Sequence, residues 1–205
     1  MRRGRFIVLE GIDGAGTTTQ AQRMRDWLRE CGVSVHLTRE PSDGPVGMLI
    51  RAVLSGRLAS ADGSPFDRRS LALLFAADRL DHITSEIAPR LGKGVTVISD
   101  RYVYSSLAYQ TLDCDPRWVA EINRLAPVPD LCVFLSVPAR AAESRMRSSR
   151  QTRDIFEKLA LQKRVAASYA RALARLPRGR LLALDGTRPV DEVFETIRKR
   201  LSRLV

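Results

Sequence analysis

Short apolar runs alternate along this chain with longer segments in which apolar residues recur every three or four positions. The apolar runs are rich in Val, Ile or Leu and predict five strands, over residues 6–10, 34–38, 95–99, 131–137 and 181–184. The periodic segments predict helices over about 18–31, 67–91, 116–125, 139–146, 155–176 and 190–204. Strands that are apolar throughout are buried on both faces, so the alternation predicts an α/β fold in which a doubly wound, parallel, five-stranded sheet is flanked by helices. Ligands of such sheets bind at the carboxyl ends of the strands.

Length and cysteine content narrow the class of protein. The 205 residues fit one domain, which we expect to cover residues 1–205. No apolar run is long enough for a membrane-spanning helix, and Glu10 and Asp13 interrupt any hydrophobic region of a signal peptide. Cys31, Cys114 and Cys132 are scattered without metal-ligand spacing, which favours a reducing compartment. We therefore expect a cytoplasmic protein without a membrane partner.

The formal net charge of +11 raises the question of nucleic-acid binding. Residues 140–180 contain twelve Lys or Arg and three Asp or Glu, so most of the excess is expected in one segment rather than along a whole face. Four arginines in this segment fit the clamping of a polyphosphate: Arg145, Arg147, Arg150 and Arg153. Basic residues are not interleaved with aromatic ones, so we expect no specific nucleic-acid partner, only weak and strongly salt-dependent binding.

Residues 11–18 carry most of a phosphate-binding loop. Gly11, Gly16 and Thr18 match the pattern G-x-x-x-x-G-K-[ST], but Thr17 occupies the position of the lysine. A glycine-rich turn after a strand can be purely structural. This one lies between a predicted strand and a predicted helix, whose N-terminal dipole favours an anion. The loop therefore indicates a nucleotide site without its usual lysine, in which the Thr18 hydroxyl can bind Mg²⁺.

Charged residues follow the second and third predicted strands, at residues 38–41 and 99–102. An Asp–Arg pair is often only an ion pair. Asp100 and Arg101 follow a buried run, however, so Asp100 can hold Mg²⁺ and Arg101 can bind phosphate. On the long predicted helix, Phe75 and Arg79 are four residues apart and share a face. Phe75 alone would be assigned to the core, but together the two can stack on a base and bond its edge.

Several segments together resemble the thymidylate kinase family. They are residues 10–16, 38–41, 74–79, 100–102 and 105–110, followed by a late turn, residues 185–187, similar to the family's adenine-side turn. The resemblance extends over essentially the whole chain. It implies a fold of the P-loop kinase type and transfer of the γ-phosphate of ATP to dTMP with Mg²⁺, which gives dTDP and ADP. It also leads us to expect a homodimer.

The resemblance implies a role for each matching residue. ATP is expected at Gly11, Ile12, Asp13, Gly14, Ala15, Gly16, Thr17, Thr18 and Thr19, and Mg²⁺ at Thr18 and Asp100. The dTMP contacts are expected at Asp13, Arg39, Pro41, Arg51, Phe75, Arg79, Arg101, Ser105, Ser106, Tyr109 and Gln110. Phe75 would stack on thymine, Arg79 would bond its carbonyl edge, and Tyr109 would lie under the deoxyribose. Ser106 stands where some members carry Asn.

The remaining expectations concern the missing lysine. Gly14 brings no side chain to the phosphates, and members of this kind supply arginines from a lid, expected here at about residues 148–156. The implied catalytic set is Asp13, Arg101, Arg145, Arg147, Arg150 and Arg153. A lid arginine would supply the charge that Thr17 lacks. Two alternatives are a weakened or silent kinase that still binds nucleotide, and a kinase acting on another nucleoside or nucleotide.

Overall fold

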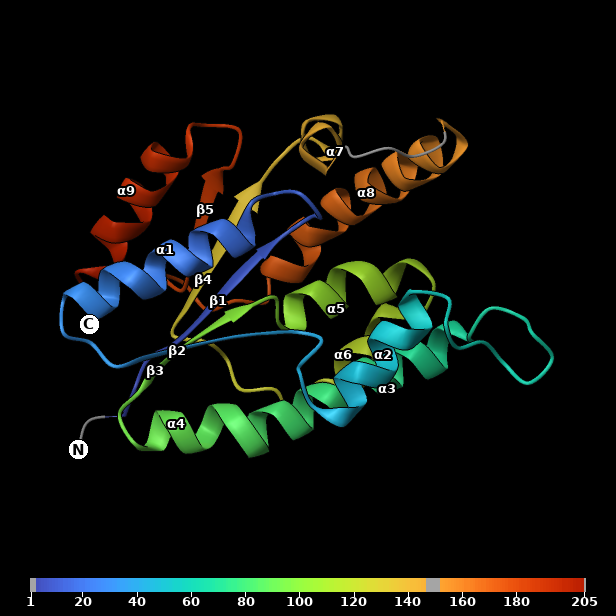
Figure 1. The fold of residues 1–205 in the computed structure, drawn as a ribbon, viewed down its shortest axis with the longest axis horizontal. Helices are drawn as coiled ribbons and strands as arrows, with labels where there is room; N and C mark the ends of the chain where they lie inside the picture. The colour runs from blue at the N-terminus through green and yellow to red at the C-terminus, as the bar shows by residue number, and fades with distance from the viewer. Residues whose placement is uncertain (1–2, 147–151, 205) are drawn as a thin grey trace.

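Five parallel strands form the centre of the fold, in the spatial order β2-β3-β1-β4-β5. The structure is a computed structural model that describes the backbone of residues 3–146 and 152–204, and the side chains of these residues except 146 and 152–158. The strands are β1 (Phe6–Gly11), β2 (Val35–Arg39), β3 (Thr96–Asp100), β4 (Leu131–Ser136) and β5 (Leu181–Asp185). Each predicted strand is confirmed, with ends that differ by one residue at most. The predicted doubly wound, parallel sheet is also confirmed (Figure 1).

The burial of the central strand, β1, explains why its apolar run predicted a strand. All six residues of β1 are buried, since β3 and β4 flank it in the sheet and helices cover both of its faces. Phe6 at its start packs edge-to-face on Tyr102, with ring centroids 5.0 Å apart. Because every pairing is parallel, the five carboxyl ends lie at one edge of the sheet, and the amino ends lie at the opposite edge.

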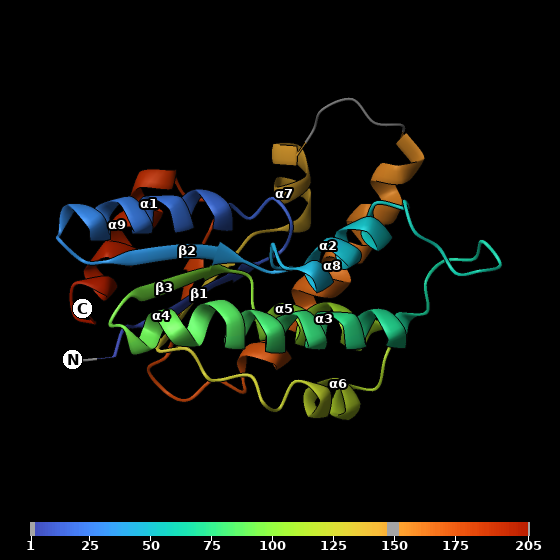
Figure 2. The ribbon, with the colours of Figure 1, turned by 60° about the horizontal axis from the view of Figure 1, so that its bottom comes forward.

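Helices cover both faces of the sheet (Figures 1 and 2). The elements are α1 (Thr17–Glu30), α2 (Pro45–Leu54), α3 (Arg68–His82), the π-helical turn η1 (Ile83–Ile87), α4 (Ala88–Gly92), α5 (Val103–Tyr109), the 3-10 turn η2 (Gln110–Leu112), α6 (Pro116–Ile122), α7 (Ala139–Met146), α8 (Thr152–Leu173) and α9 (Val190–Leu201). Helices α1 and α9 lie on one face. The run α3-η1-α4, together with α5 and α8, lies on the other. The predicted helix over 67–91 is this run, interrupted by the π-helical turn.

Helix α2 was not predicted, and its sequence explains why. Gly44, Pro45 and Gly47 are typical of a turn, yet Pro45 occupies the first helical turn, where its missing N–H costs nothing. Gly47 is needed because a Cβ there would lie 2.0 Å from the carbonyl oxygen of Ser42. The glycine thus lets the loop after β2 pack directly on α2, which places that loop beside the ligand edge of the sheet.

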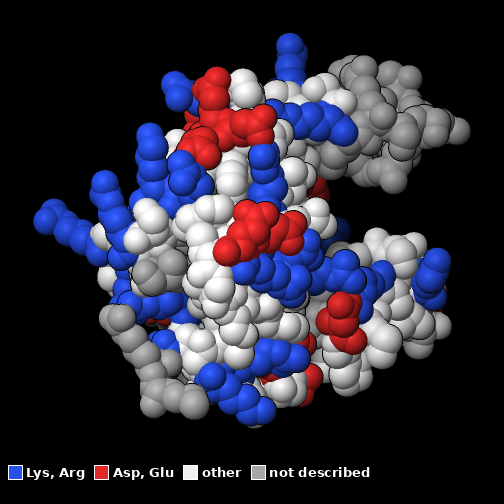
Figure 3. Space-filling view, turned by 60° about the vertical axis from the view of Figure 1, so that its left-hand side comes forward, with Lys and Arg blue, Asp and Glu red and all other residues white. Residues whose placement is uncertain are grey.

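The two chain ends lie near each other at the amino ends of the strands, where the Arg5 Nε donates to the carbonyl oxygen of Leu204 at 2.9 Å (Figure 1). Figure 3 turns this side of the molecule toward the viewer, with Lys and Arg side chains spread over much of it. Among the helices of the described residues, none is both long and apolar enough to cross a membrane.

Candidate active site

The predicted phosphate-binding loop connects β1 to α1 at the carboxyl edge of the sheet. Gly14 and Gly16 have positive φ angles of 80° and 95°, which side-chain-bearing residues rarely adopt. Helix α1 begins at Thr17, and its first turn contains no acidic residue, so its N-terminal dipole faces the loop uncompensated. A cavity of about 650 Å³ opens here, of the size of a small-molecule site. Residues 13–20 line it, together with residues of β3, β4, α7 and α9 and of the loops after β3 and β5.

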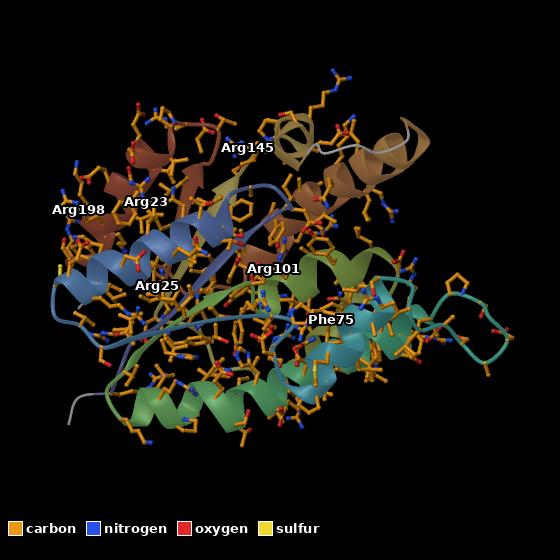
Figure 4. All side chains as sticks on the ribbon, viewed as in Figure 1. Arg23, Arg25, Phe75, Arg101, Arg145 and Arg198 are labelled. Carbon is orange, nitrogen blue, oxygen red and sulfur yellow. The ribbon has the colours of Figure 1, made fainter. Side chains whose placement is uncertain are left out.

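Three arginines line the same cavity: Arg101, Arg145 and Arg188. Thr17 is buried, with 7% of its surface exposed, and brings no charge to it. Arg145 extends from α7 toward the loop (Figure 4): its Nη2 donates to the carbonyl oxygen of Gly186 at 2.9 Å, and its Nη1 reaches that of Ala15 at 3.5 Å. It therefore bridges the phosphate-binding loop and the turn after β5. Arg147 and Arg150 lie outside the described residues, as does the side chain of Arg153.

Thr18 and Asp100 meet at the ends of α1 and β3. The Thr18 hydroxyl donates to Asp100 Oδ2 at 2.5 Å, while Oδ1 of the same carboxylate is buried without a hydrogen-bond partner. A hydroxyl beside a carboxylate with an unused oxygen is a donor pair that suits Mg²⁺. The described residues contain no group of three or more His, Cys, Asp and Glu side chains placed to hold a metal. An ion here would therefore depend on phosphate oxygens and water for its other ligands, as Mg²⁺ commonly does.

Arg101 follows β3 in the left-handed region, with a φ of 73°. This conformation costs energy for a residue with a side chain, so surrounding contacts must hold it. Its Nη2 donates to Asp13 Oδ1 at 2.6 Å, its Nη1 donates to the Ser105 hydroxyl at 3.2 Å, and its guanidinium carbon lies 5.5 Å from the centre of the Tyr109 ring. Arg101 thus connects the phosphate-binding loop to α5.

Glu10, which was not among the predicted site residues, holds the turn that contains Arg101 in place. Its fully buried carboxyl accepts from the backbone N–H groups of Tyr102 and Ser105, at 2.9 and 3.2 Å. It also accepts from the Ser105 hydroxyl at 2.6 Å and from the Tyr169 hydroxyl at 3.1 Å. Burial raises the pKa of Glu10 from 4.5 to about 7, although these hydrogen bonds and Arg101 oppose the shift. The carboxyl therefore secures the turn that contains Arg101 and ties it to α8.

A second buried network surrounds Arg79 on α3. Only 2% of Arg79 is exposed. Its Nε and Nη2 donate to Glu40 Oε2 at 3.0 and 2.7 Å, its Nη2 donates to the Ser106 hydroxyl at 2.9 Å, and its Nη1 donates to Asn123 Oδ1. Among the described residues, the second N–H of Nη1 has no acceptor. Phe75, one turn earlier on α3, is half-buried (Figure 4).

The other predicted acceptor residues fall into two groups. Arg39 donates to Asp43 at 2.7 Å, and Arg51 donates to the carbonyl oxygens of Pro41 and Ser42 at 3.0 and 2.6 Å, so these residues form one cluster around the loop after β2. Tyr109 and Gln110 lie at the end of α5. Among the described residues, the Tyr109 hydroxyl and the Gln110 Oε1 are buried and have no hydrogen-bond partner.

Sequence reasoning missed Glu10, Glu40, Asn123, Gln162 and Tyr169. Gln162 on α8 donates to Asp13 Oδ2 at 2.9 Å, so the helix that follows the predicted lid contacts the phosphate-binding loop directly. Each missed residue is buried or half-buried and bonds a predicted site residue that is distant in the sequence. Polar residues inside otherwise apolar segments, as Glu10 is after Phe6–Leu9, were the one available signal.

Comparison with known proteins agrees with this geometry. The model of the family described as "Thymidylate kinase" matches residues 9–197. A "Probable thymidylate kinase" of Pyrococcus horikoshii is 42% identical over 182 residues, 88% of each chain. One of Methanococcus maripaludis is 40% identical over 94% of this chain and 92% of its own. A "Thymidylate kinase" of Trichormus variabilis is 35% identical over 97% of this chain and 96% of its own. The chain belongs to the thymidylate kinase family and is an ATP-dependent kinase that phosphorylates dTMP to dTDP.

Proposed function

We propose that the phosphoryl group passes between two subsites that meet at Arg101. The main support for this proposal is the position of the Arg101 guanidinium, which lies between Asp13 of the phosphate-binding loop and the Tyr109 ring on α5. A cation held there can bind the acceptor phosphate while facing the donor cavity that it also lines. Because phosphoryl transfer needs alignment and charge neutralisation more than covalent help, a rigid arginine between two anions suits it.

On the acceptor side, we assign dTMP to the space bordered by Phe75, Arg79, Tyr109 and Gln110. The free N–H of Arg79 would donate to a thymine carbonyl, and the ring of Phe75 would stack on the base. The unpaired oxygens of Tyr109 and Gln110 would satisfy polar groups of the nucleotide.

Arg39, Pro41 and Arg51 would close this acceptor site near the phosphate. Ser105 and Ser106 bond to Glu10 and Arg79, respectively, so their proposed effect on dTMP binding is indirect.

On the donor side, ATP would occupy the cavity, with its phosphates against the backbone N–H groups of residues 11–19. Mg²⁺ would supply charge neutralisation of the phosphate oxygens at Thr18 and Asp100, whose unpaired Oδ1 fits such an ion. Arg145 would provide the positive charge that Thr17 does not. It already contacts the loop through backbone carbonyls, which bind it less strongly than a carboxylate would. Arg147, Arg150 and Arg153 remain predictions.

We also propose a homodimer in a cytoplasmic, reducing environment. Helices α2 and α3 pack together and expose five large apolar residues, Met48, Leu49, Leu54, Leu73 and Leu80. Exposed apolar side chains on neighbouring helices are typical of a protein interface. The cysteines Cys31, Cys114 and Cys132 are free thiols, consistent with a reducing compartment. Light scattering of the wild type and of Leu73→Lys tests this interface. We expect the wild type to be a dimer and Leu73→Lys to be a monomer. If Leu73→Lys is also a dimer, this interface is rejected.

The decisive experiment is a coupled ADP-release assay with dTMP, dUMP, dCMP and thymidine. We expect dTMP to be the best acceptor, dUMP a poorer one and thymidine to be unused, because Arg101 then lacks its phosphate. Turnover of thymidine equal to that of dTMP would refute the assignment of Arg101. Thr17 favours one alternative, a protein that binds both nucleotides but is catalytically silent. Calorimetric binding of dTMP without ADP release in the assay would establish that alternative.

A further inference from the structure

The edge of the sheet at which the strands begin forms a continuous surface far from the active site. Six segments meet there: residues 3–5, 29–34, 90–95, 128–130, 174–180 and 198–204. Hydrogen bonds join them, since Gly4 N–H donates to Leu91 O at 2.9 Å, Arg5 donates to Leu204 O at 2.9 Å, and Arg180 donates to Pro129 O at 3.0 Å. We call these six segments the amino-edge surface.

Almost the whole net charge of the protein lies on this surface. The six segments contain twelve Lys or Arg and two Asp or Glu, a net charge of +10 against +11 for the whole chain. The cations are Arg3, Arg5, Arg29, Arg90, Lys93, Arg175, Arg178, Arg180, Arg198, Lys199, Arg200 and Arg203. Basic residues therefore gather on one face as well as in residues 140–180, because folding brings together segments that are far apart in the sequence.

Hardly any of these cations is neutralised by the protein. Of the twelve, Arg198 alone has a described carboxylate within 4.0 Å, that of Glu195 at 2.7 Å. Arg5, Arg180 and Arg200 donate to backbone carbonyls instead. One of the two acids, Asp130, accepts from the backbone N–H of Phe6 at 2.8 Å. Some cations elsewhere, such as the half-buried Arg23 and the exposed Arg39, do have carboxylate partners.

Helix dipoles account for only part of this arrangement. Basic residues are favourable in the last turn of a helix, which explains Arg29, Arg90 and those near the end of α9. Lys93, Arg178 and Arg180 follow helix ends and precede strands, and Arg3 precedes the first strand. Unpaired like charges repel one another and destabilise the folded state. A surface that retains so many of them is suited to an external polyanion.

We propose that the amino-edge surface binds the phosphate backbone of a nucleic-acid duplex, independently of sequence. Ten of its twelve cations are arginines, whose guanidinium groups bind phosphate oxygens bidentately. Seven cations are exposed. Figure 3 shows Lys and Arg side chains spread over a broad face, with clusters of Asp and Glu between them, and such a spread fits an extended ligand. The six segments contain no Phe, Trp, Tyr or His, so the surface lacks the stacking residues of a single-strand site.

Other polyanions fit this surface less well. A membrane surface usually requires an apolar anchor besides basic residues, whereas Val128 is the one exposed large apolar residue described in the six segments. An acidic protein would need a contact area that is more apolar at its centre. Duplex binding requires only contacts to phosphates, which position a ligand without reading its sequence.

The test compares two triple variants of equal charge. Lys93→Glu, Arg178→Glu and Arg203→Glu alter the amino-edge surface. Arg57→Glu, Arg117→Glu and Lys163→Glu alter exposed cations elsewhere that have no described carboxylate partner. Each triple lowers the formal net charge from +11 by six. Binding is measured by fluorescence anisotropy with a labelled 25-base-pair DNA duplex, and with the RNA duplex of the same length, from 50 to 200 mM KCl.

We expect the wild type to bind both duplexes, with log Kd rising linearly with log salt. The amino-edge triple should weaken binding about tenfold or more at 100 mM KCl and lower the salt slope by about 2 to 3, since each lost phosphate contact removes about 0.9. The control triple should stay within about threefold. The kcat of the amino-edge triple should match the wild type, because its three positions are distant from the active site. Saturating ATP analogue and dTMP should not displace the duplex.

Equal weakening by both triples would overturn the proposal, because net charge alone would then explain binding. Displacement of the duplex by the two nucleotides would also overturn it, because the active-site arginines would then be the binding groups. So would tighter binding to phosphatidylserine vesicles than to either duplex, or no duplex binding by the wild type at 50 mM KCl. If the glutamate triple fails to fold, the corresponding glutamine triple takes its place, with the same comparisons.

Discussion

Glu10→Gln should change how the stability of this kinase depends on pH. The Glu10 carboxyl is completely buried beneath Arg101, and burial raises its pKa from 4.5 to about 7. Its carboxyl oxygens accept from two backbone N–H groups and two hydroxyls. Glutamine keeps an oxygen for the backbone donors, and the hydroxyls of Ser105 and Tyr169 can rotate to accept from its amide. Tyr169 already has a second acceptor, the carbonyl oxygen of Gly11 at 3.1 Å.

The direction of the effect follows from proton linkage. Because folding raises the pKa of Glu10, the native state binds more protons than the unfolded state between pH 4.5 and about 7. The contribution of Glu10 to stability is therefore full below pH 4.5 and is lost as the pH rises through about 7. A shift from 4.5 to about 7 corresponds to about 3 kcal/mol, and most of it, about 2.5 kcal/mol, falls between pH 5 and 8. Glutamine does not ionise and escapes this loss.

Urea denaturation of the wild type and Glu10→Gln at pH 5, 6, 7 and 8 measures the difference. The free energy of unfolding of the variant minus that of the wild type should rise by about 2.5 kcal/mol from pH 5 to pH 8, which corresponds to about 1 M in the urea midpoint. Glu30→Gln, at an exposed carboxyl on α1, is the control and should show a constant difference. If the difference in unfolding free energy between Glu10→Gln and the wild type stays constant with pH within about 0.5 kcal/mol, burial does not keep the Glu10 carboxyl partly protonated.

Three further substitutions test the two subsites. Arg145→Ala should lower kcat about a hundredfold with a smaller effect on dTMP affinity, because its charge acts on the donor phosphates; unchanged kcat would remove it from the mechanism. Thr17→Lys should raise kcat less than about tenfold if Arg145 already supplies the charge, whereas a gain near a hundredfold would show a loop that nothing compensates. Asn123→Ala should destabilise the fold by about 1–3 kcal/mol and raise the KM for dTMP, because Arg79 then loses a buried acceptor. Asn123→Asp, which keeps an acceptor, should restore the KM; a KM unchanged by alanine would show that Asn123 does not position Arg79.

The parts of the fold that were predictable are those set by local patterns. The five strands follow from apolar runs, of which those of β1, β3 and β4 are mostly buried whereas the edge strands β2 and β5 are more exposed, and helix α7 follows from its periodicity. Helix α2 was missed because Pro45 and Gly47 are typical of turns, and only the tertiary contact at Ser42 explains the glycine. Local sequence therefore predicted the strands and most helices, but not α2, whose Gly47 serves packing.

The site residues also differ in whether local sequence or tertiary packing reveals them. Residues in contiguous motifs, such as Asp100 and Arg101, were found, and the structure places them together with the phosphate-binding loop. Their buried supports come from far along the chain: Tyr169 is 159 residues from Glu10, and Asn123 is 44 residues from Arg79. No local pattern carries such pairings, because they depend on how the layers pack.

The two sides of the active site are held in different ways, and this bears on the missing lysine. On the acceptor side, Arg79 donates to the buried carboxylate of Glu40, and Arg101 donates to Asp13 from a turn that Glu10 secures through Ser105 and the backbone. Such charge-assisted contacts preorganise the cations before dTMP arrives. Among the described residues, Arg145 on the donor side donates only to backbone carbonyls, which a phosphate can displace at little cost. A cation free to move toward ATP is what a loop with Thr17 requires, because this loop holds no positive charge of its own. The rigid acceptor side sets the position of the reaction, and the adjustable donor side supplies the charge as the phosphates enter.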